Sequence, residues 1–261
     1  MELREILEKL AKGDISVRIA EQELKLFSIE YVEKNLAKID PLRELRSGIP
    51  EVILGEGKEL KDLYKIIVAT VSKKGFAVIS KVTPDYMDKL FKKLEKEKLT
   101  LEKGINTLLV TSKSHRFPKK NGKVGILCAG TSDIKIAEEA KIMAEVMGCE
   151  TLVEYDVGIA GIHRTLKALS KMISSQVDII IVVAGMEGAL GSVVSSITDI
   201  PVIGVPTSIG YGFGSNGIAA LASMLQTCSM GMTVVNIDNG IGAGAFAAMV
   251  ANKMSAKSKS A

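Results

Sequence analysis

Apolar runs of five to eight residues alternate with helical patterns over the second half of the chain. The first run is KVGILCAG at 123–130, the last is MTVVNIDNG at 232–240, and each is followed by apolar residues at helical spacing. Continuous apolar runs of this length are typical of parallel strands covered on both faces, with the helices as crossovers. The pattern predicts an α/β fold built on a doubly wound parallel sheet.

The first half of the chain has a different pattern, with charged amphipathic helices and shorter strands. Helical spacing covers about 2–12, 16–36, 58–73 and 84–97, and the segments FAVISKV and NTLLVTS resemble short strands. Between them lies RSGIPEVILGEGK at 46–58, where glycine and proline flank a further strand. These features predict a small α+β domain.

A change in composition near SHRFPKKNGK at 114–123 indicates the boundary between the two halves. The first half is basic and the second is slightly acidic and richer in glycine. We therefore expect an N-terminal domain at 1–118, a catalytic domain at 119–252 and a flexible basic tail at 253–261. The basic residues alternate with glutamates along helices and lack interleaved aromatic residues, so a solvated surface is favoured over nucleic-acid binding.

Several classes of protein are disfavoured by composition. Three cysteines without a C-x-x-C motif and only two histidines argue against a disulfide framework or a structural zinc site. No charge occurs from Ile200 to Ile237, but prolines and glycines divide this run into pieces too short to span a membrane. The first residues form a charged amphipathic pattern without an apolar signal core, so we expect a cytoplasmic protein.

In doubly wound sheets, ligands bind beyond the carboxyl ends of the strands, and most polar residues of the second half follow such ends. In CAGTSD at 128–133, a glycine and small hydroxyl residues between strand and helix suit an anion such as phosphate. The alternative is that Ser132 or Asp133 only caps the helix. The loop lacks the lysine of a Walker motif and the glycine spacing of a dinucleotide-binding motif.

Two further strand ends carry charged candidates. His163 and Arg164 open a helix after a glycine-rich turn, where an arginine suits phosphate or carboxylate, although a surface histidine and a structural ion pair are equally plausible. Glu187 is the single charged residue between Asp178 and Asp199. A carboxylate placed there would lose hydration and become a usable base, with helix capping as the alternative.

The glycines at 210, 212, 214 and 217 predict a loop that closely approaches a ligand or serves as a mobile lid. Asp156 and Asp238 end two more strands, and together with Asp133 they are candidates for binding magnesium or ribose.

Cys228 is the most ambiguous residue. It ends a helical pattern that Gly231 would cap, and the negative end of a helix disfavours a thiolate, so local features favour a buried, inert cysteine. Cys128 and Cys149 are expected in the core. Because Cys228 precedes the last strand, it should lie at the amino edge of the sheet, opposite the glycine-rich loops. A catalytic Cys228 would require either an unusual course of the chain or a neighbouring subunit that supplies it.

A resemblance changes this interpretation. The run GTSD…DVGIAGIHR…VVAGMEGAL…PVIGVPTSIGYG…SMLQTCSMGMTVVNIDNGIGAG, with SGIPEVILGEGK upstream, resembles the LarB family, pyridinium-3,5-biscarboxylic acid mononucleotide synthases of nickel-pincer cofactor biosynthesis. The second half is more distantly similar to the PurE family of aminoimidazole ribonucleotide carboxylases and mutases. The resemblance implies that the chain carboxylates nicotinic acid adenine dinucleotide at C5 of the ring and hydrolyses its phosphoanhydride, releasing AMP.

By motif match, the resemblance places the nucleophile on Cys228 and the ring-deprotonating base on Glu187. It also implies magnesium near the phosphoanhydride, carbon dioxide or bicarbonate as co-substrate, and a homo-octamer with shared active sites. The residues expected to bind the substrate are those at the carboxyl strand ends: Gly130, Thr131, Ser132, Asp133, Asp156, His163, Arg164, Gly185, Met186, Thr207, Ser208, Gly210, Tyr211, Asp238 and Asn239.

Two alternatives stay open. PurE proteins carry a histidine about where Ala189 stands, and this chain has no histidine after His163, so a purine carboxylase or mutase ranks second. A nucleotide-binding regulator without catalytic activity is the third interpretation.

Overall fold

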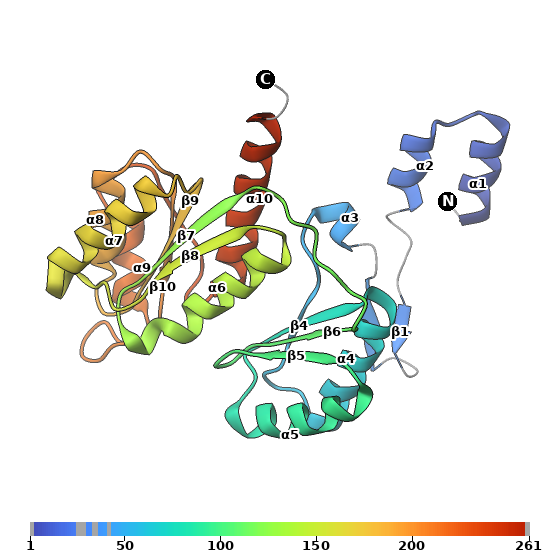
Figure 1. Ribbon diagram of the computed structural model, residues 1–261, viewed down its shortest axis with the longest axis horizontal. Coiled ribbons are helices and arrows are strands. Elements are labelled where there is room, and N and C mark those ends of the chain that lie inside the picture. Colours follow the sequence, from blue (N-terminus) through green and yellow to red (C-terminus); the bar gives the residue numbers. More distant parts are fainter. Residues whose placement is uncertain (1–2, 25–29, 33–35, 41–42, 259–261) are drawn as a thin grey trace. The chain divides into compact units, whose positions relative to one another are not determined.

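The computed structural model describes residues 3–24, 30–32, 36–40 and 43–258, and it divides into two compact units (Figure 1). The N-terminal unit comprises residues 1–102 and 108–115, and the C-terminal unit comprises 103–107 and 116–261. No helix within the described ranges has the length and apolar character needed to cross a membrane.

The N-terminal unit is α+β. Its elements are α1 (Leu3–Lys12), α2 (Val17–Leu24), β1 (Glu30–Val32), β2 (Ala37–Ile39), α3 (Arg43–Ser47), β3 (Val52–Leu54), α4 (Leu60–Lys74), β4 (Phe76–Ser80), α5 (Pro84–Leu94), a short 3-10 turn (Glu95–Glu97), β5 (Thr100–Lys103) and β6 (Leu108–Thr111). Four strands form one sheet in the order β3-β4-β6-β5, in which β4 is parallel to β3 and antiparallel to β6. Apolar side chains of α4 and α5 pack on this sheet and form the core of the unit.

One expected helix of this unit is interrupted. The helical pattern at 16–36 predicts a single helix, whereas α2 ends at Leu24 and Glu30–Val32 form a strand paired antiparallel with Ala37–Ile39. Tyr31 and Val32 favour extended structure, and the antiparallel pairing satisfies backbone groups that the periodicity had assigned to helix. Residues 25–29 and 33–35 of the expected helix lie outside the described residues.

The C-terminal unit is the predicted doubly wound α/β domain. Its strands are β7 (Lys123–Cys128), β8 (Glu150–Glu154), β9 (Ile179–Ala184), β10 (Val202–Pro206) and β11 (Met232–Val234). All neighbouring strands are parallel, in the order β11-β10-β9-β7-β8. The strand order reverses between β7 and β9, and such a switch point is where ligands bind in open parallel sheets.

Helices cover both faces of this sheet (Figure 1). The helices are α6 (Ile134–Val146), α7 (Ile162–Ser174), α8 (Ala189–Ile197), α9 (Ile218–Leu225) and α10 (Gly240–Ser258). Apolar residues of α7, α8 and α9 form one core cluster with the sheet, and α6 packs against α10. Strand β9 is buried along its whole length, which explains its uninterrupted apolar sequence.

Glycines allow α10 to approach α6 closely. A Cβ at Gly240 would lie 2.2 Å from the carbonyl oxygen of Ile136, and one at Gly244 would lie 2.3 Å from that of Ala140. The helix also extends further than expected, since α10 continues to Ser258 through the segment predicted to start a flexible tail at 253. Lysine, methionine and alanine in this segment are good helix formers, so nothing local ends the helix there.

Candidate active site

A cavity of about 470 Å³ lies at the carboxyl ends of the central strands. Its walls come from the loops that follow β7, β8, β9 and β10, together with the start of α8, at the point where the strand order reverses. The lining residues are Ala129, Gly130, Thr131, Ser132, Asp133, Asp156, Gly158, Ile159, Ala160, Ala184, Gly185, Met186, Glu187, Ala189, Leu190 and Ile209. Eight predicted site residues are therefore brought together: Gly130, Thr131, Ser132, Asp133, Asp156, Gly185, Met186 and Glu187.

The loop after β7 presents hydroxyl groups at a helical start. Thr131 and Ser132 are exposed at the first turn of a short 3-10 helix (Thr131–Asp133) that leads directly into α6. The N–H of Ala129 donates to the carbonyl of Val183 at 2.9 Å, and the N–H of Gly158 donates to the carbonyl of Ala129 at 2.9 Å. The loop is therefore held by both neighbouring strand ends, in a form that suits an anion.

Asp133 is buried beneath this loop. Its side chain accepts a hydrogen bond from the Thr207 hydroxyl at 2.6 Å and one from the Gly130 N–H at 3.0 Å. The N–H of Gly185 also donates to it, and the residue is only 4% exposed. Burial raises the pKa of Asp133, while the donors from Thr207 and Gly130 lower it. Asp133 thus caps its turn, as the alternative to anion binding predicts. Its hydrogen bonds also join the ends of β7, β9 and β10.

The loop after β8 contains an ion pair. Asp156 pairs with Arg164 in the first turn of α7, and a Cβ at Gly161 would lie 2.7 Å from Nε of Arg164. The guanidinium of Arg164 therefore folds back closely over Gly161. His163 is exposed and is not among the residues that line the cavity.

The loop after β9 places Glu187 in the cavity wall. A Cβ at Gly185 would lie 2.3 Å from the carbonyl oxygen of Ile209, so only glycine fits where the loops after β9 and β10 meet. Glu187 is exposed, which differs from the loss of hydration expected for it, because the turn projects beyond the buried strand. Among the described residues, no hydrogen bond or ion pair engages its carboxylate, in contrast to Asp133 and Asp156.

The remaining predicted residues lie on the loops after β10 and β11. Thr207 is fully buried, and the N–H of Ser208 donates to the carboxylate of Asp238 at 2.9 Å. Asn239 accepts from the N–H of Gly242 at 2.9 Å, within the first turn of α10. Gly210 lies next to Met186, whereas Tyr211 is 83% exposed and does not line the cavity.

Three residues at these strand ends have left-handed backbone conformations although they are not glycine. Asp156, Met186 and Asp238 have φ of +55°, +50° and +54°. Such conformations are unfavourable for residues with a Cβ and persist where the surrounding structure fixes them, often at functional sites. Their placement after β8, β9 and β11 agrees with a ligand site along this edge of the sheet.

Cys228 lies elsewhere in the chain, as its sequence position predicts. The N–H of Val202, at the start of β10, donates to the carbonyl of Gly231 at 3.0 Å, so this segment lies at the amino edge of the sheet. The hydroxyl of Ser229 donates to the carbonyl of Ser192 in α8 at 3.0 Å. Cys228 does not line the cavity that contains Glu187.

The expectation of a buried Cys228, drawn from local features, is wrong, because its side chain is exposed. Helix α9 ends at Leu225, and the hydroxyl of Thr227 accepts from the N–H of Ser229 at 3.2 Å. This local turn competes with the helix, so Cys228 lies in a loop beyond the helix end. Cys128 and Cys149 are buried as expected, and burial raises the pKa of their thiols to about 12 and about 11.

The three carboxylates proposed for magnesium do not form a metal-binding group. No cluster of three or more histidine, cysteine, aspartate or glutamate side chains with suitable geometry occurs in the described part of the chain. Asp133, Asp156 and Asp238 each already bind a protein group. These residues do not fit a resident metal ion, and magnesium would have to enter on the phosphates of a substrate.

Sequence reasoning missed the apolar part of the cavity wall. Ile159, Leu190 and Ile209 line it, although none was selected as a site residue. Ile159 follows Gly158 and Ile209 follows Ser208 at strand ends, which was the available signal for these two, whereas Leu190 lies in the first turn of α8 and carried no such signal. Apolar walls with a few convergent polar groups are typical of small-molecule sites.

Comparison with known proteins divides the chain at a similar point. The profile of AIR carboxylase matches residues 123–261, and that of the LarB/PurE-like N-terminal domain matches residues 31–108. An uncharacterized protein of Methanocaldococcus jannaschii is 48% identical over 97% of this chain and 98% of its own length.

Shorter matches cover the second half. The N5-carboxyaminoimidazole ribonucleotide mutase of Methanocaldococcus jannaschii is 34% identical over 44% of this chain and 69% of its own length. That of Thermotoga maritima is 30% identical over 49% of this chain and 74% of its own length.

Proposed function

Since this chain belongs to the AIR carboxylase family and carries a LarB/PurE-like N-terminal domain, we propose that it carboxylates a pyridinium nucleotide. The substrate we propose is nicotinic acid adenine dinucleotide, which gains a carboxylate at C5 of the ring. Hydrolysis of its phosphoanhydride then gives AMP and pyridinium-3,5-biscarboxylic acid mononucleotide.

The observation that carries the proposal is the chemical character of the cavity. Of the three carboxylates that line it, Glu187 is the one without a hydrogen bond or ion pair among the described residues, and no histidine lines it. A free carboxylate can take a proton from carbon, whereas Asp133 and Asp156 are held by other groups. Proton transfer in this cavity therefore falls to a carboxylate rather than to an imidazole.

The proposed reaction begins with Cys228. Its thiolate adds to C6 of the pyridinium ring, which neutralises the ring and makes C5 nucleophilic. C5 then forms a carbon–carbon bond with carbon dioxide, supplied as such or from bicarbonate. Glu187 accepts the proton from C5, and the departing thiolate restores the aromatic pyridinium. The positive charge of the substrate ring stabilises the thiolate, so no protein cation is required beside it.

The phosphate on the pyridinium side of the anhydride is assigned to the loop after β7 and to Arg164. The hydroxyl-bearing residues Thr131 and Ser132 line the cavity there and would bind a phosphate, and a guanidinium binds phosphate through parallel hydrogen bonds. Water adds to one phosphorus, the anhydride P–O bond breaks, and AMP leaves. Magnesium would be carried by the two phosphates of the anhydride.

The separation of Cys228 from the cavity agrees with a site shared between subunits. Cys228 lies at the amino edge of the sheet and Glu187 at the carboxyl edge. We therefore propose a homo-oligomer, an octamer by resemblance to the family, in which Cys228 of one subunit reaches the cavity of another.

A purine mutase is the second candidate, because the mutases match the C-terminal unit. Two observations rank it lower. The first is the lack of a histidine in the cavity: PurE proteins carry one about where Ala189 stands, and His163, the last histidine in the chain, lies outside the cavity. In Methanocaldococcus jannaschii, moreover, the mutase and the full-length relative of this chain are separate proteins.

The proposal is tested with purified full-length protein, nicotinic acid adenine dinucleotide, bicarbonate and magnesium. We expect AMP and a mononucleotide that has gained one carboxylate, detected by mass spectrometry. Cys228→Ser is expected to abolish carboxylation and to keep dinucleotide binding, whereas a regulator would be indifferent to the change. Formation of neither product by the unmodified protein would refute the proposed reaction, and turnover of N5-carboxyaminoimidazole ribonucleotide would favour the mutase.

A further inference from the structure

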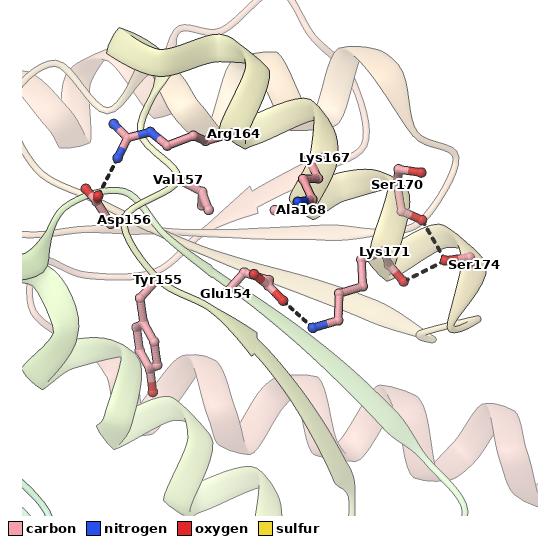
Figure 2. Close-up of a pocket in the computed structure, with 10 residues that line it drawn as sticks. All are labelled: Glu154, Tyr155, Asp156, Val157, Arg164, Lys167, Ala168, Ser170, Lys171 and Ser174. Carbon is pink, nitrogen blue, oxygen red and sulfur yellow. Dashed lines mark hydrogen bonds and ion pairs between the residues drawn. The ribbon is translucent and has the colours of Figure 1, made fainter.

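A second cavity, of about 700 Å³, lies beside the first, between the carboxyl end of β8 and helix α7 (Figure 2). Its lining residues are Glu154, Tyr155, Asp156, Val157, Arg164, Lys167, Ala168, Ser170, Lys171 and Ser174. Asp156 lines both cavities, and its ion pair with Arg164 therefore lies where the two meet. A ligand longer than one cavity would cross this pair.

The helix side of the second cavity is basic. Arg164, Lys167 and Lys171 are spaced at i, i+3 and i+7, so they lie along one side of α7. Arg164 pairs with Asp156 and Lys171 pairs with Glu154, as Figure 2 shows. Lys167 lies between the two pairs, and it has no hydrogen bond or ion pair among the described residues. The three cations exceed the two carboxylates, so the cavity favours an anion.

The cavity offers little for recognising a particular base. Tyr155 is the one aromatic residue among those that line it, and its side chain points toward α6, where its hydroxyl donates to Glu138 (Figure 2). The ring of Tyr155 therefore points away from α7 and is not placed to stack on a base bound along that helix. Recognition would rest on the phosphate, so the chemical class that fits is a nucleoside monophosphate with weak base selectivity.

We propose that the second cavity binds the AMP half of the dinucleotide, with Lys167 as its phosphate ligand. This inference rests on the proposed function, which requires a site for two nucleotides. The pyridinium nucleotide would occupy the cavity of Glu187, the phosphoanhydride would cross the Asp156–Arg164 pair, and the leaving nucleotide would lie along α7. The two cavities have about 470 and 700 Å³, each within the range of small-molecule sites. The left-handed backbone of Asp156 lies at the junction, where a fixed geometry would matter most.

The test compares two charge reversals on the full-length chain. Lys167→Glu changes the proposed phosphate ligand, and Lys253→Glu makes the same change on an exposed position of α10 that lines neither cavity. Binding of AMP and of nicotinic acid mononucleotide is measured by calorimetry. We expect Lys167→Glu to weaken AMP binding about tenfold, since it exchanges attraction for repulsion at one phosphate. Mononucleotide binding should stay within about twofold, and Lys253→Glu should leave both affinities within about twofold.

The outcomes separate this inference from the proposed function. Unchanged AMP binding in Lys167→Glu, or equal weakening of both ligands, overturns the second site even where the dinucleotide is carboxylated. Selective loss of AMP binding supports the site even where no carboxylation occurs, in which case the proposed reaction alone fails. With an active enzyme, the KM for the dinucleotide should rise in Lys167→Glu by about the same factor as the Kd of AMP.

Discussion

Replacing Thr207 with valine tests whether its buried hydrogen bond to Asp133 holds the floor of the site. Valine keeps the shape of threonine and removes the hydroxyl that donates to the carboxylate at 2.6 Å. Both side chains are buried, so water cannot replace the lost donor. Hydrogen bonds to charged groups contribute about 1.5–3 kcal/mol, and we expect a loss of about 2 kcal/mol in the free energy of unfolding at neutral pH.

The loss should depend on pH, with a sign that follows from the pKa of Asp133. Burial raises the pKa of Asp133 in the folded protein above its value in the unfolded chain. The folded protein therefore holds this proton more tightly than the unfolded chain does, and the ionisation of Asp133 lowers the free energy of unfolding as the pH rises above the unfolded pKa. The hydrogen bond from Thr207 opposes this rise in pKa. Without it, the cost of the ionised form increases. The difference between the two proteins should therefore be largest at neutral pH and shrink as the pH falls and Asp133 becomes protonated in both.

The assay is urea denaturation followed by circular dichroism, for the original protein, Thr207→Val, Asp133→Asn and the double variant. Thr207→Ser is the matched control because it keeps the hydroxyl, and it should cost about 1 kcal/mol, independent of pH, for the lost methyl group. In the Asp133→Asn background, Thr207→Val should cost less than about 1 kcal/mol. An equal cost in both backgrounds, or a cost that does not change with pH, would show that the pair is not the source of the stability.

Three further predictions concern the thiols, the loops and the oligomer. Iodoacetamide at pH 8 should label the exposed Cys228 and spare Cys128, whose thiol is buried and has its pKa raised to about 12. Mass spectrometry measures the labelling, and faster labelling of Cys128 than of Cys228 would contradict the burial of Cys128. Gly185→Ala should lower the free energy of unfolding by about 2 kcal/mol or more, because the new Cβ would lie 2.3 Å from a backbone carbonyl oxygen; unchanged denaturation would contradict this close approach. Cys228→Ser and Glu187→Gln should each be inactive alone and regain partial carboxylation when co-expressed as mixed oligomers, and continued inactivity of the mixture would argue against a shared site.

The sequence predicted which residues lie at the carboxyl ends of the strands, but not the contacts that these residues make. The order of apolar runs and helices placed Gly130, Asp133, Asp156 and Glu187 at one edge of a parallel sheet, and the cavity collects all four. The role of Asp133 was not readable, because its partner Thr207 is 74 residues away and only the packed sheet brings them together. The exposure of Glu187 was missed for a related reason, since neighbouring apolar residues do not show how far a turn projects from the sheet.

What the sequence by itself determined is the doubly wound α/β domain, since buried parallel strands require continuous apolar runs and crossovers require amphipathic helices. It also determined that Cys228 precedes the last strand and lies at the amino edge. The tertiary structure decided that this cysteine is exposed, because the hydrogen bond from Ser229 to the carbonyl of Ser192 in α8 holds the segment after α9 at the surface of the unit. It alone revealed the second cavity, because Glu154, Lys167 and Lys171 form a common wall only when α7 packs beside the edge strand β8.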